Sequence, residues 1–320
     1  MKRILFFALL LFPVFTFAQA PAITDTLKVV TEPLPKSWKK GGSFGFNFTQ
    51  TTYNNWAAGG VNSLSGQMLL GLYVNYKKDS TTWENSGDFA FGLVQQGKGY
   101  ARKTDDKIDL TSKYSRYAFG NVWYYSALLG FKTQFLPGYT FEGDTARTLV
   151  SDFLSPAYTI LAIGLDYKPN KKFSLFIAPV TGKITFVNNQ ELADQGAFGV
   201  KAAEYDTAGH RLVPGENIRY EFGGYVRAQY QAEIMTNVNF KARLELFTNY
   251  LDHPGNIDVN AETLISMKVN KFITASLASQ VIYDNDINID VDKNHDGIIE
   301  ATGPRLQFRQ VLGVGFGVKF

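Results

Sequence analysis

The chain contains no cysteine and no long apolar run beyond its first residues, and each absence excludes a class of protein. Without cysteine there are no disulfide bonds and no thiol chemistry, even for an exported protein. The one sustained apolar run, residues 4–15, is shorter than the roughly 18 residues that a transmembrane helix requires. A membrane protein built from helices is therefore excluded.

An excess of charge of either sign is also missing. The formal net charge is +3 at pH 7. Lys2 and Arg3, the apolar run at 4–15 and the small residues Thr16 and Ala18 have the layout of a secretory signal peptide, residues 1–18, which we expect to be cleaved after Ala18. Its removal takes away two cations and no acid, so the net charge falls to +1. A near-neutral chain gives no support to nucleic-acid binding.

What the sequence does have is alternation of polarity with a period of two. Residues 19–41 show none, and we interpret them as a periplasmic N-terminal linker. From Gly42 to the end the alternation is sustained. In the last segment one face carries only apolar residues and the other carries small or polar ones, as a strand between lipid and a wet lumen requires. The apolar positions are Leu312, Val314, Phe316, Val318 and Phe320.

Counting these segments predicts the architecture. There are twelve, and an even number returns both ends of a barrel to the same side of the membrane. The links between them are alternately short and long, which is typical of tight periplasmic turns and extended surface loops. We therefore predict an all-β fold, a transmembrane up-and-down antiparallel β-barrel over residues 42–320, in the outer membrane of a Gram-negative bacterium. The predicted strands are 43–52, 63–77, 83–94, 107–118, 121–135, 157–168, 173–187, 217–233, 238–250, 259–269, 273–283 and 305–320.

Two details refine this prediction. Pro179 lies inside the seventh segment, and because proline cannot donate a hydrogen bond to a neighbouring strand, a β-bulge is expected there. Outward-facing aromatic residues gather near both ends of the strands, which predicts two interfacial girdles. Those beside short links are Tyr76, Trp83, Trp123, Tyr167, Phe173 and Phe320, and those near long links are Phe135, Tyr220, Tyr283 and Phe308.

Several phrases carry a family resemblance. They are NNWAAGGVNSLSG, the TQF at 133–135, SPAYTILAIGLDYKPNKKFS, LADQGAFGV and the ending GPRLQFRQVLGVGFGVKF. Together they resemble a Bacteroidota family of outer-membrane β-barrels catalogued as a domain of unknown function, over about residues 38–320. The resemblance implies a position in outer-membrane lipid and insertion by the barrel-assembly machinery. It implies no catalytic residues.

The loop before the last segment contains an acidic pattern. Asp292, Asn294, Asp296 and Gly297 match positions one, three, five and six of an EF-hand calcium loop, but position twelve is Gly303 instead of an acid. Glu300 or Asp290 could replace that acid. A Ca²⁺ ion held by Asp290, Asp292, Asn294, Asp296 and Glu300 and a solvated acidic turn both remain open.

Charged residues also fall on the inward face of the predicted strands. If residues 235–237 form a three-residue turn, Arg227 lies opposite Glu245. The mixed signs suit either a narrow, weakly selective pore or a plug of ion pairs. Bulky inward residues favour a largely filled lumen, namely Tyr73, Tyr124, Tyr158 and Tyr225. The predicted pore-lining residues are Arg219, Glu221, Arg227, Lys241, Arg243, Glu245 and Arg309, with Glu262 and Lys268 on neighbouring strands.

An enzymatic function has little support in the sequence. The three histidines, His210, His253 and His295, all fall in predicted surface loops. His253 is beside Asp252, but adjacent side chains on a proline-containing turn usually diverge, and a hydrolase needs a positioned partner.

We therefore expect a non-enzymatic barrel that passes small solutes or ligands through a narrow pore. A nonconducting structural or interaction barrel that works with a partner complex is the alternative, followed by a surface hydrolase. No feature of the sequence fixes an oligomeric state.

Overall fold

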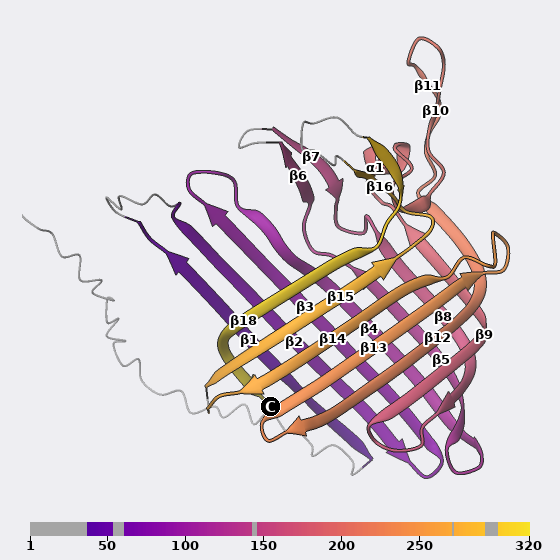
Figure 1. Ribbon diagram of the computed structural model, residues 1–320. Helices are drawn as coiled ribbons and strands as arrows, with labels where there is room; N and C mark the ends of the chain where they lie inside the picture. The colour runs from indigo at the N-terminus through magenta and orange to yellow at the C-terminus, as the bar shows by residue number, and fades with distance from the viewer. Residues whose placement is uncertain (1–36, 54–60, 143–145, 271, 292–299) are drawn as a thin grey trace, which may run out of the picture. The chain divides into compact units, whose positions relative to one another are not determined.

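Twelve strands close into one antiparallel barrel in the computed structural model, which describes residues 37–53, 61–142, 146–270, 272–291 and 300–320 (Figure 1). Around the barrel the order is β1-β18-β15-β14-β13-β12-β9-β8-β5-β4-β3-β2, so the last strand pairs with the first. The predicted fold class is confirmed. The barrel strands are β1 (Trp38–Thr51), β2 (Ser63–Lys78), β3 (Thr81–Gln96), β4 (Arg102–Phe119), β5 (Trp123–Thr133), β8 (Ala157–Tyr167), β9 (Phe173–Phe186), β12 (Ile218–Met235), β13 (Val238–Asn249), β14 (Asp258–Lys268), β15 (Ile273–Tyr283) and β18 (Gln307–Lys319).

Two strands start five residues earlier than the sequence predicts. β1 begins at Trp38, so residues 38–41 belong to the barrel and not to the linker, and β4 begins at Arg102 instead of Lys107. In both places charged residues or glycines obscure the alternation, while pairing with a neighbour maintains the strand, as between Trp38 and Tyr76. The signal peptide and the linker up to residue 36 lie outside the described residues.

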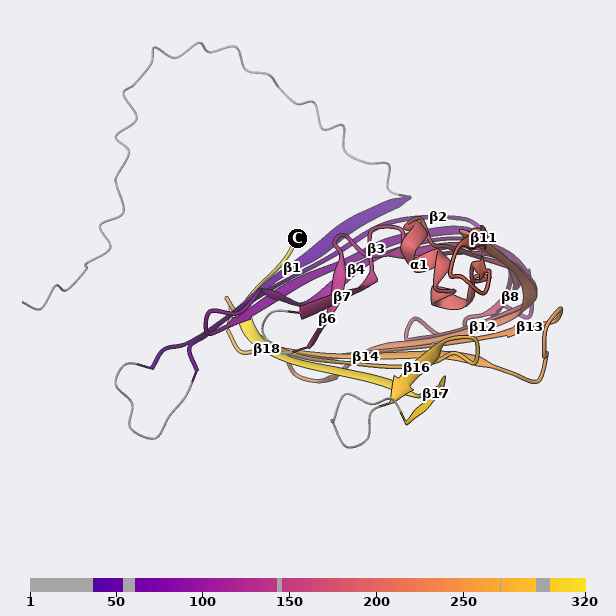
Figure 2. The ribbon, with the colours of Figure 1, turned by 90° about the horizontal axis from the view of Figure 1, so that it is seen from above.

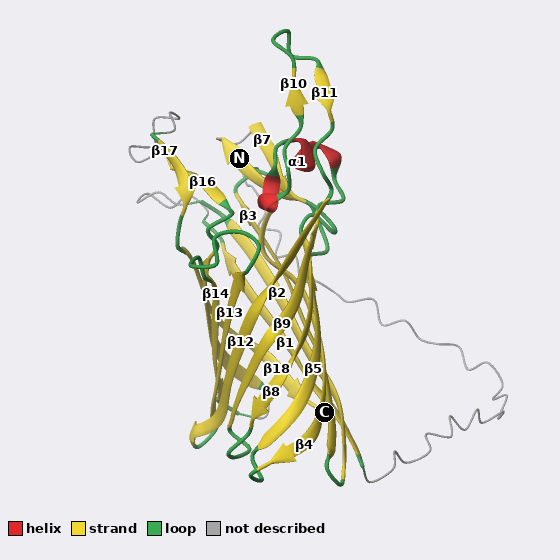
Figure 3. Cartoon of the chain, turned by 90° about the vertical axis from the view of Figure 1, so that its right-hand side faces the viewer, coloured by secondary structure: helices red, strands yellow, loops and turns green. Residues whose placement is uncertain are grey.

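The connections confirm the alternation of short and long links (Figure 3). At one end of the barrel, tight turns join β2 to β3, β4 to β5 and β12 to β13. Asp79, Asn121 and Asn237 have positive φ angles in these turns, a conformation that aspartate and asparagine tolerate better than most residues. The other end carries the long loops. We refer to these as the turn end and the loop end.

The loops at the loop end contain small elements of their own that the sequence did not predict. They are the hairpins β6 (Gly138–Glu142) with β7 (Ala146–Ser151), β10 (Glu204–Tyr205) with β11 (Arg211–Val213), and β16 (Asn288–Val291) with β17 (Ala301–Pro304), together with α1 (Gln190–Asp194) and a 3-10 turn at Ala197–Gly199. The β10–β11 hairpin projects beyond the other loops (Figures 1 and 3). No helix in the described part of the chain is long and apolar enough to cross a membrane.

A β-bulge lies at Pro179, as predicted. The register of β9 shifts against both neighbours there, between the partners Ala178 and Thr181 on the β12 side and between Ile177 and Val180 on the β8 side. Gly164 on β8 faces this bulge, and a side chain there would lie 2.0 Å from the carbonyl oxygen of Ile177. The bulge therefore requires glycine opposite it.

The outer wall is apolar. Large hydrophobic side chains on alternate positions of the strands are exposed, including Leu161, Ile163, Leu312 and Phe316. At the turn end aromatic rings cluster on this wall, with Trp38 5.0 Å from Tyr76 and Trp123 4.9 Å from Tyr167 between ring centroids. An exposed apolar wall with an aromatic edge is the surface that a bilayer covers.

Candidate functional site

The lumen-facing side of β4 is charged and yet buried. Asp105, Asp109 and Lys113 are at most 5 % exposed, whereas Leu110 and Tyr114 on the opposite face are exposed. Because side chains alternate along a strand, the charged set points into the barrel. Buried charges need partners, and these come from the opposite wall.

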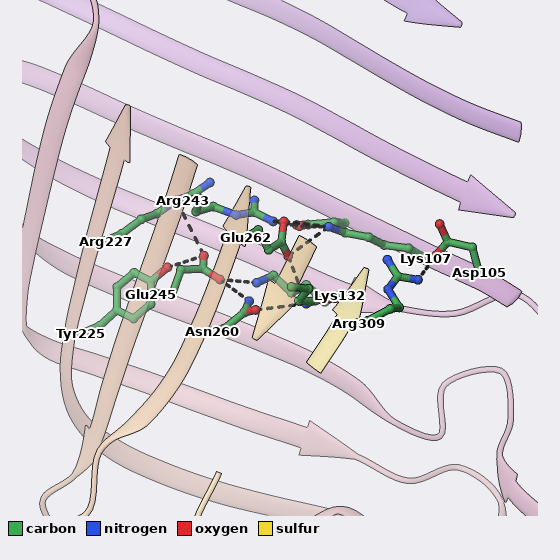
Figure 4. Close-up of polar contacts among 12 residues, drawn as sticks. Asp105, Lys107, Lys132, Tyr225, Arg227, Arg243, Glu245, Asn260, Glu262 and Arg309 are labelled. Atoms are coloured by element: carbon green, nitrogen blue, oxygen red, sulfur yellow. Dashed lines mark hydrogen bonds and ion pairs between the residues drawn. The ribbon is translucent and has the colours of Figure 1, made fainter. Parts of the chain in front are cut away.

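Ion pairs cross the lumen from wall to wall (Figure 4). The Lys107 Nζ on β4 lies 3.1 Å from a carboxylate oxygen of Glu262 on β14, which is six strands away around the barrel. The Arg243 Nη2 on β13 lies 2.7 Å from the Asp109 carboxylate and 2.6 Å from that of Glu262. Lys132 on β5 pairs with Glu245 on β13. We call these six residues, Lys107, Asp109, Lys132, Arg243, Glu245 and Glu262, the cross-lumen bridge.

Glu245 is the most highly connected member of the bridge. Its carboxylate accepts hydrogen bonds from the Tyr225 hydroxyl at 2.7 Å and from the Asn260 amide at 2.9 Å, besides pairing with Lys132. The Arg227 Nε lies 3.7 Å away, in the register that the sequence predicts for these two residues. Both oxygens of Glu245 are thus satisfied, while the buried Asp109 Oδ1 and Arg243 Nε lack hydrogen-bond partners.

One side of the bridge is filled by a packed core. Phe176 and Tyr225 meet edge to face with centroids 6.3 Å apart, and the Lys183 Nζ lies 4.7 Å from the centroid of Phe247. The buried cluster comprises Leu128, Ala162, Phe176, Ala178, Tyr225 and Phe247, from β5, β8, β9, β12 and β13. The lumen is closed on this side.

On the other side the lumen wall carries small residues. Gly71 on β2 lies between Ser43 on β1 and Asp88 on β3, whose side-chain oxygens a Cβ at Gly71 would meet at 3.3 Å. Ser43, Ser86 and Asp88 point inward and yet are exposed to solvent. Other inward residues here are Gly45, Ala90, Ser276, Ala278, Gly315 and Gly317. Seen from the loop end, the barrel is elongated, and these strands form one end of its cross-section (Figure 2).

A polar chain links β1 to β18 through this part of the lumen. The Asn47 amide donates to Gln67 at 3.1 Å, the Gln67 amide donates to Asp105 at 2.9 Å, and Asp105 pairs with Arg309. We call these four residues the clasp. Arg309 thus connects β18 to β4 instead of to β1 beside it.

Exposed lysines surround the lumen at the turn end of the same side. Lys39, Lys77, Lys268 and Lys319 occupy inward positions on β1, β2, β14 and β18 and are exposed. No ion pair joins any of them to another described residue. The mouth at the turn end is therefore cationic.

A mixed cluster lies at the loop end. Lys183 pairs with Asp258 at 2.8 Å and with Glu221 at 3.3 Å, and Arg219 pairs with Glu221 at 3.2 Å and with Asp286 at 2.5 Å. Asp284 lies beside Asp258 and Asp286, with carboxylate oxygens within 4.8 Å of one another. Burial raises the pKa of Asp284, Lys183 opposes this rise and Asp258 adds to it. Lys183 and Arg219 thus supply two positive charges to a cluster of four carboxylates.

Most of the pore-lining residues that the sequence predicts lie in ion pairs, and one does not. Arg219, Glu221, Arg227, Arg243, Glu245 and Arg309 all belong to the ion pairs described above, while Lys241 is exposed near the turn end. Sequence reasoning missed Asp105, Lys107, Asp109 and Lys132. The alternation of Lys107 and Asp109 in KIDLTSK was the available signal, since both fall on one face of a predicted strand.

The predicted calcium loop is only partly described. Asp292, Asn294 and Asp296 lie outside the described residues, Asp290 belongs to β16, and Glu300 is exposed just before β17. Calcium binding there stays a prediction.

The histidines give a different result from the one expected. Asp252 and His253 do not diverge, because the ring Nδ1 lies 2.5 Å from the carboxylate. His210 is similarly 3.2 Å from Asp206. Both rings are about four-fifths exposed, and within the described residues no hydroxyl group hydrogen-bonds to either. Neither pair forms the nucleophile and base of a hydrolase.

Comparison with known proteins gives a family of unknown function and a general likeness of fold. Residues 48–139 match the family described as "Protein of unknown function (DUF3078)". This agrees with the resemblance to a domain of unknown function. No curated protein matches the sequence.

Among solved structures, the chain is similar to outer-membrane barrels. The translocator domain of the autotransporter NalP from Neisseria meningitidis is 11% identical, with 88% of this chain and 87% of that one covered and a TM-score of 0.37. An outer-membrane channel from Pseudomonas putida F1 is 11% identical, with 90% and 97% covered and a TM-score of 0.37. The Pseudomonas putida toluene transporter TodX is 11% identical, with 89% and 78% covered and a TM-score of 0.28.

Proposed function

We propose that this protein is a non-enzymatic barrel of the Gram-negative outer membrane that passes small anions along one side of its lumen. The exposure of Ser43, Ser86 and Asp88 at inward positions supports the proposal most directly. Inward side chains that reach solvent in the middle of a wall require water beside them. We also propose that the protein comes from a Bacteroidota bacterium, that it is exported with a cleaved signal peptide, and that the barrel-assembly machinery inserts it into the membrane.

The cross-lumen bridge limits what can pass. Because it connects opposite walls and the core fills the space beyond it, a solute has to pass along the strip of β1, β2, β3, β15 and β18, where the clasp also lies. Such a strip admits water, ions and small solutes but no bulky ones.

The charges along this strip favour anions. Four exposed lysines, Lys39, Lys77, Lys268 and Lys319, are at its mouth, and the inward acids of β3 are Asp88 and Glu84, of which Glu84 pairs with Lys113 and Lys168. Rings of lysine or arginine attract anions into pores. We therefore expect a channel with weak anion selectivity.

Planar-bilayer recordings test this function. Purified protein is expected to give discrete conductance steps, with a reversal potential in a potassium chloride gradient that indicates preference for chloride. The triple variant Lys39→Gln, Lys77→Gln and Lys319→Gln should move the reversal potential toward potassium, because it removes positive charge from the mouth. The matched control is Lys78→Gln, since Lys78 follows Lys77 but faces outward, and it should leave the reversal potential unchanged.

A nonconducting structural barrel is the second candidate. The ion pairs of the bridge and the packed core favour it, because they make the barrel rigid without requiring transport. Bilayers that stay silent with correctly folded protein would establish this second function in place of the first. If neutralising both Arg227 and Glu245 changes the conductance, the conducting path also runs along the bridge.

A further inference from the structure

The seam between β1 and β18 is paired over only part of its length. Five register pairs join the two strands, from Ser43 with Lys319 to Asn47 with Gly315, and backbone hydrogen bonds of 2.8 and 3.0 Å add Gly42 and Phe320. Every other seam of the barrel has ten or more register pairs. The barrel is therefore least tightly closed where its first and last strands meet.

The missing pairs all lie on the loop-end side of Asn47. β1 continues to Thr51, paired with Ser63, and β18 starts at Gln307, paired with Ile282, so each strand is paired on its other side. Continuing the seam register would place residues 48–51 opposite 314–311. At about 3.4 Å per residue, four missing pairs leave an opening about 14 Å tall. Figure 1 shows β1 and β18 diverging toward the loop end.

Two glutamines, Gln50 and Gln310, lie beside this opening among apolar outward side chains such as Phe48, Leu312 and Val314. The Gln310 amide on β18 donates to Ser279 at 3.4 Å, and the Gln50 amide on β1 donates to Thr52 at 3.3 Å. Gln50 and Gln310 are exposed. Unpaired backbone groups cannot face hydrocarbon without cost, so water or a polar ligand is expected between these two edges.

A pocket of about 370 Å³ lies at the loop end of β1, on the side of β2 and β3. Its lining includes Gln50, Thr51, Thr52, Asn62, Ser63 and Gln95. Polar groups therefore line the end of β1 next to the opening as well.

Behind the opening is the clasp. Arg309 is on the open part of β18, and its side chain is 41% exposed although it pairs with Asp105. A guanidinium has five N–H donors, so donors remain for an anionic group that arrives through the seam. Gly313, four residues further along β18, has no side chain, and a Cβ there would lie 2.3 Å from the Asn47 amide nitrogen, so glycine leaves room for the first member of the clasp.

We propose that the open part of the β1–β18 seam, residues 48–51 and 307–314, is a lateral portal that admits an acidic amphiphile from the bilayer to Arg309. The apolar chain of such a molecule suits Phe48, Leu312 and Val314, and its acidic head suits the guanidinium. The portal rests on the membrane location in the proposed function and does not depend on the conductance.

Photolabelling from the lipid phase tests the portal. The full-length mature protein, in lipid nanodiscs, is irradiated with a fatty acid that carries a photoactivatable group on its chain, and adducts are mapped by mass spectrometry. The portal predicts adducts on lumen-facing Thr49, Thr51 and Val311 as well as on lipid-facing residues. Adducts restricted to lipid-facing residues would overturn it, whatever the bilayer recordings show.

Closing the seam provides the second test. The native chain has no cysteine, so Gln50→Cys with Leu312→Cys can be joined by oxidation or by a short bifunctional thiol reagent. Joining them should abolish the lumen-facing adducts and leave the lipid-facing ones. The matched control joins Phe44→Cys with Val318→Cys, which are register partners already, and should label as wild type. Persistence of lumen-facing adducts in the closed variant would contradict the portal.

The role of Arg309 is tested with a matched pair of ligands. Labelling of the lumen face by the fatty acid should exceed labelling by the fatty alcohol of the same length. Arg309→Gln should reduce labelling by the fatty acid to the level of the alcohol. Arg309→Lys should retain the preference for the acid, because it keeps the positive charge. Equal labelling by acid and alcohol in the wild-type protein would show that the portal does not select an acidic head group. Retention of the preference in Arg309→Gln would show that Arg309 does not bind the head.

Discussion

Glu245 joins three other strands through one carboxylate. Its partners Lys132, Tyr225 and Asn260 come from β5, β12 and β14, and the residue itself is 8% exposed. A buried charge is tolerated only where its hydrogen bonds are satisfied, and both oxygens here have partners. At the scale of single residues, this carboxylate holds the bridge together.

Glu245→Gln is expected to destabilise the barrel by about 3–5 kcal/mol, because the cations of Lys132 and Arg227 lose their buried counter-charge. Urea-induced unfolding in lipid vesicles, followed by tryptophan fluorescence, measures the change in the free energy of unfolding. Lys241→Gln is the control, since Lys241 is exposed and forms no ion pair with another described residue. Equal stability of the two variants would show that the bridge does not stabilise the fold.

The sequence predicts some of these contacts and not others. The register of β12 on β13 follows from the short turn between them, so Arg227 opposite Glu245 was predictable. Contacts across the lumen, such as Lys107 with Glu262, depend on the tilt and stagger of all twelve strands. Local alternation contains no information about that geometry.

At the scale of elements, the bulge in β9 has a strict steric requirement. Gly164 faces the bulge, where an added Cβ would lie 2.0 Å from a backbone oxygen, whereas Gly182 on β9 has nothing within 4 Å. Gly164→Ala should therefore reduce the fraction of folded barrel, and Gly182→Ala should not. Heat-dependent mobility on a denaturing gel measures that fraction. Comparable folding of the two variants would mean that the bulge adapts to a side chain.

The loop that carries α1 is anchored by Asp194. The Gln190 amide donates to its carboxylate at 2.7 Å, and the Gly215 N–H and the Arg211 guanidinium also donate to it. These hydrogen bonds, that of Gln190 first, lower the pKa of Asp194 below 3.8. The stability that these hydrogen bonds give to the folded loop is present above pH 3.8. It is lost as pH falls through the lowered pKa of Asp194 in the folded loop.

Pepsin cleavage of this loop should therefore accelerate steeply as pH falls below 3.8, the usual pKa of aspartate. Asp194→Asn should be cleaved faster at higher pH and should lack the steep dependence. Asp206→Asn, at the far turn of the β10–β11 hairpin, is the control that leaves this anchor intact. The same pH profile in wild type and Asp194→Asn would contradict the role of Asp194.

The strands were more predictable than the loop elements. Ten or more residues of alternating polarity predict a strand. The strands of a short hairpin such as β10–β11 have two or three residues, too few to show an alternation. The same limit applies to α1, whose five residues are held by the Asn189 side chain as N-cap.

At the scale of the whole molecule, the barrel exposes its apolar residues and buries its charges. Leu312 and Phe316 are outside while Asp109 and Lys113 are inside, the reverse of a water-soluble protein. The sequence predicted this inversion from alternation alone. The partial opening of the β1–β18 seam was not predictable, because the apolar alternation of β18 continues through its unpaired part.

Residues 19–320, the chain without the proposed signal peptide, are therefore expected to fold only in detergent or lipid. Circular dichroism should show strand content after refolding into detergent micelles and aggregation after dilution into buffer. A barrel covered by detergent should also resist trypsin except at its loops. A folded, detergent-free monomer in buffer would contradict the membrane assignment.

The β10–β11 hairpin stands clear of the other loops, and its turn at Gly209 has open space around it and a φ of 84°. Backbone in that position tolerates extra residues without disturbing the wall below. The turn is accordingly a natural place for an epitope tag. Antibody staining of unbroken cells that display the tag would then reveal which way the molecule is oriented.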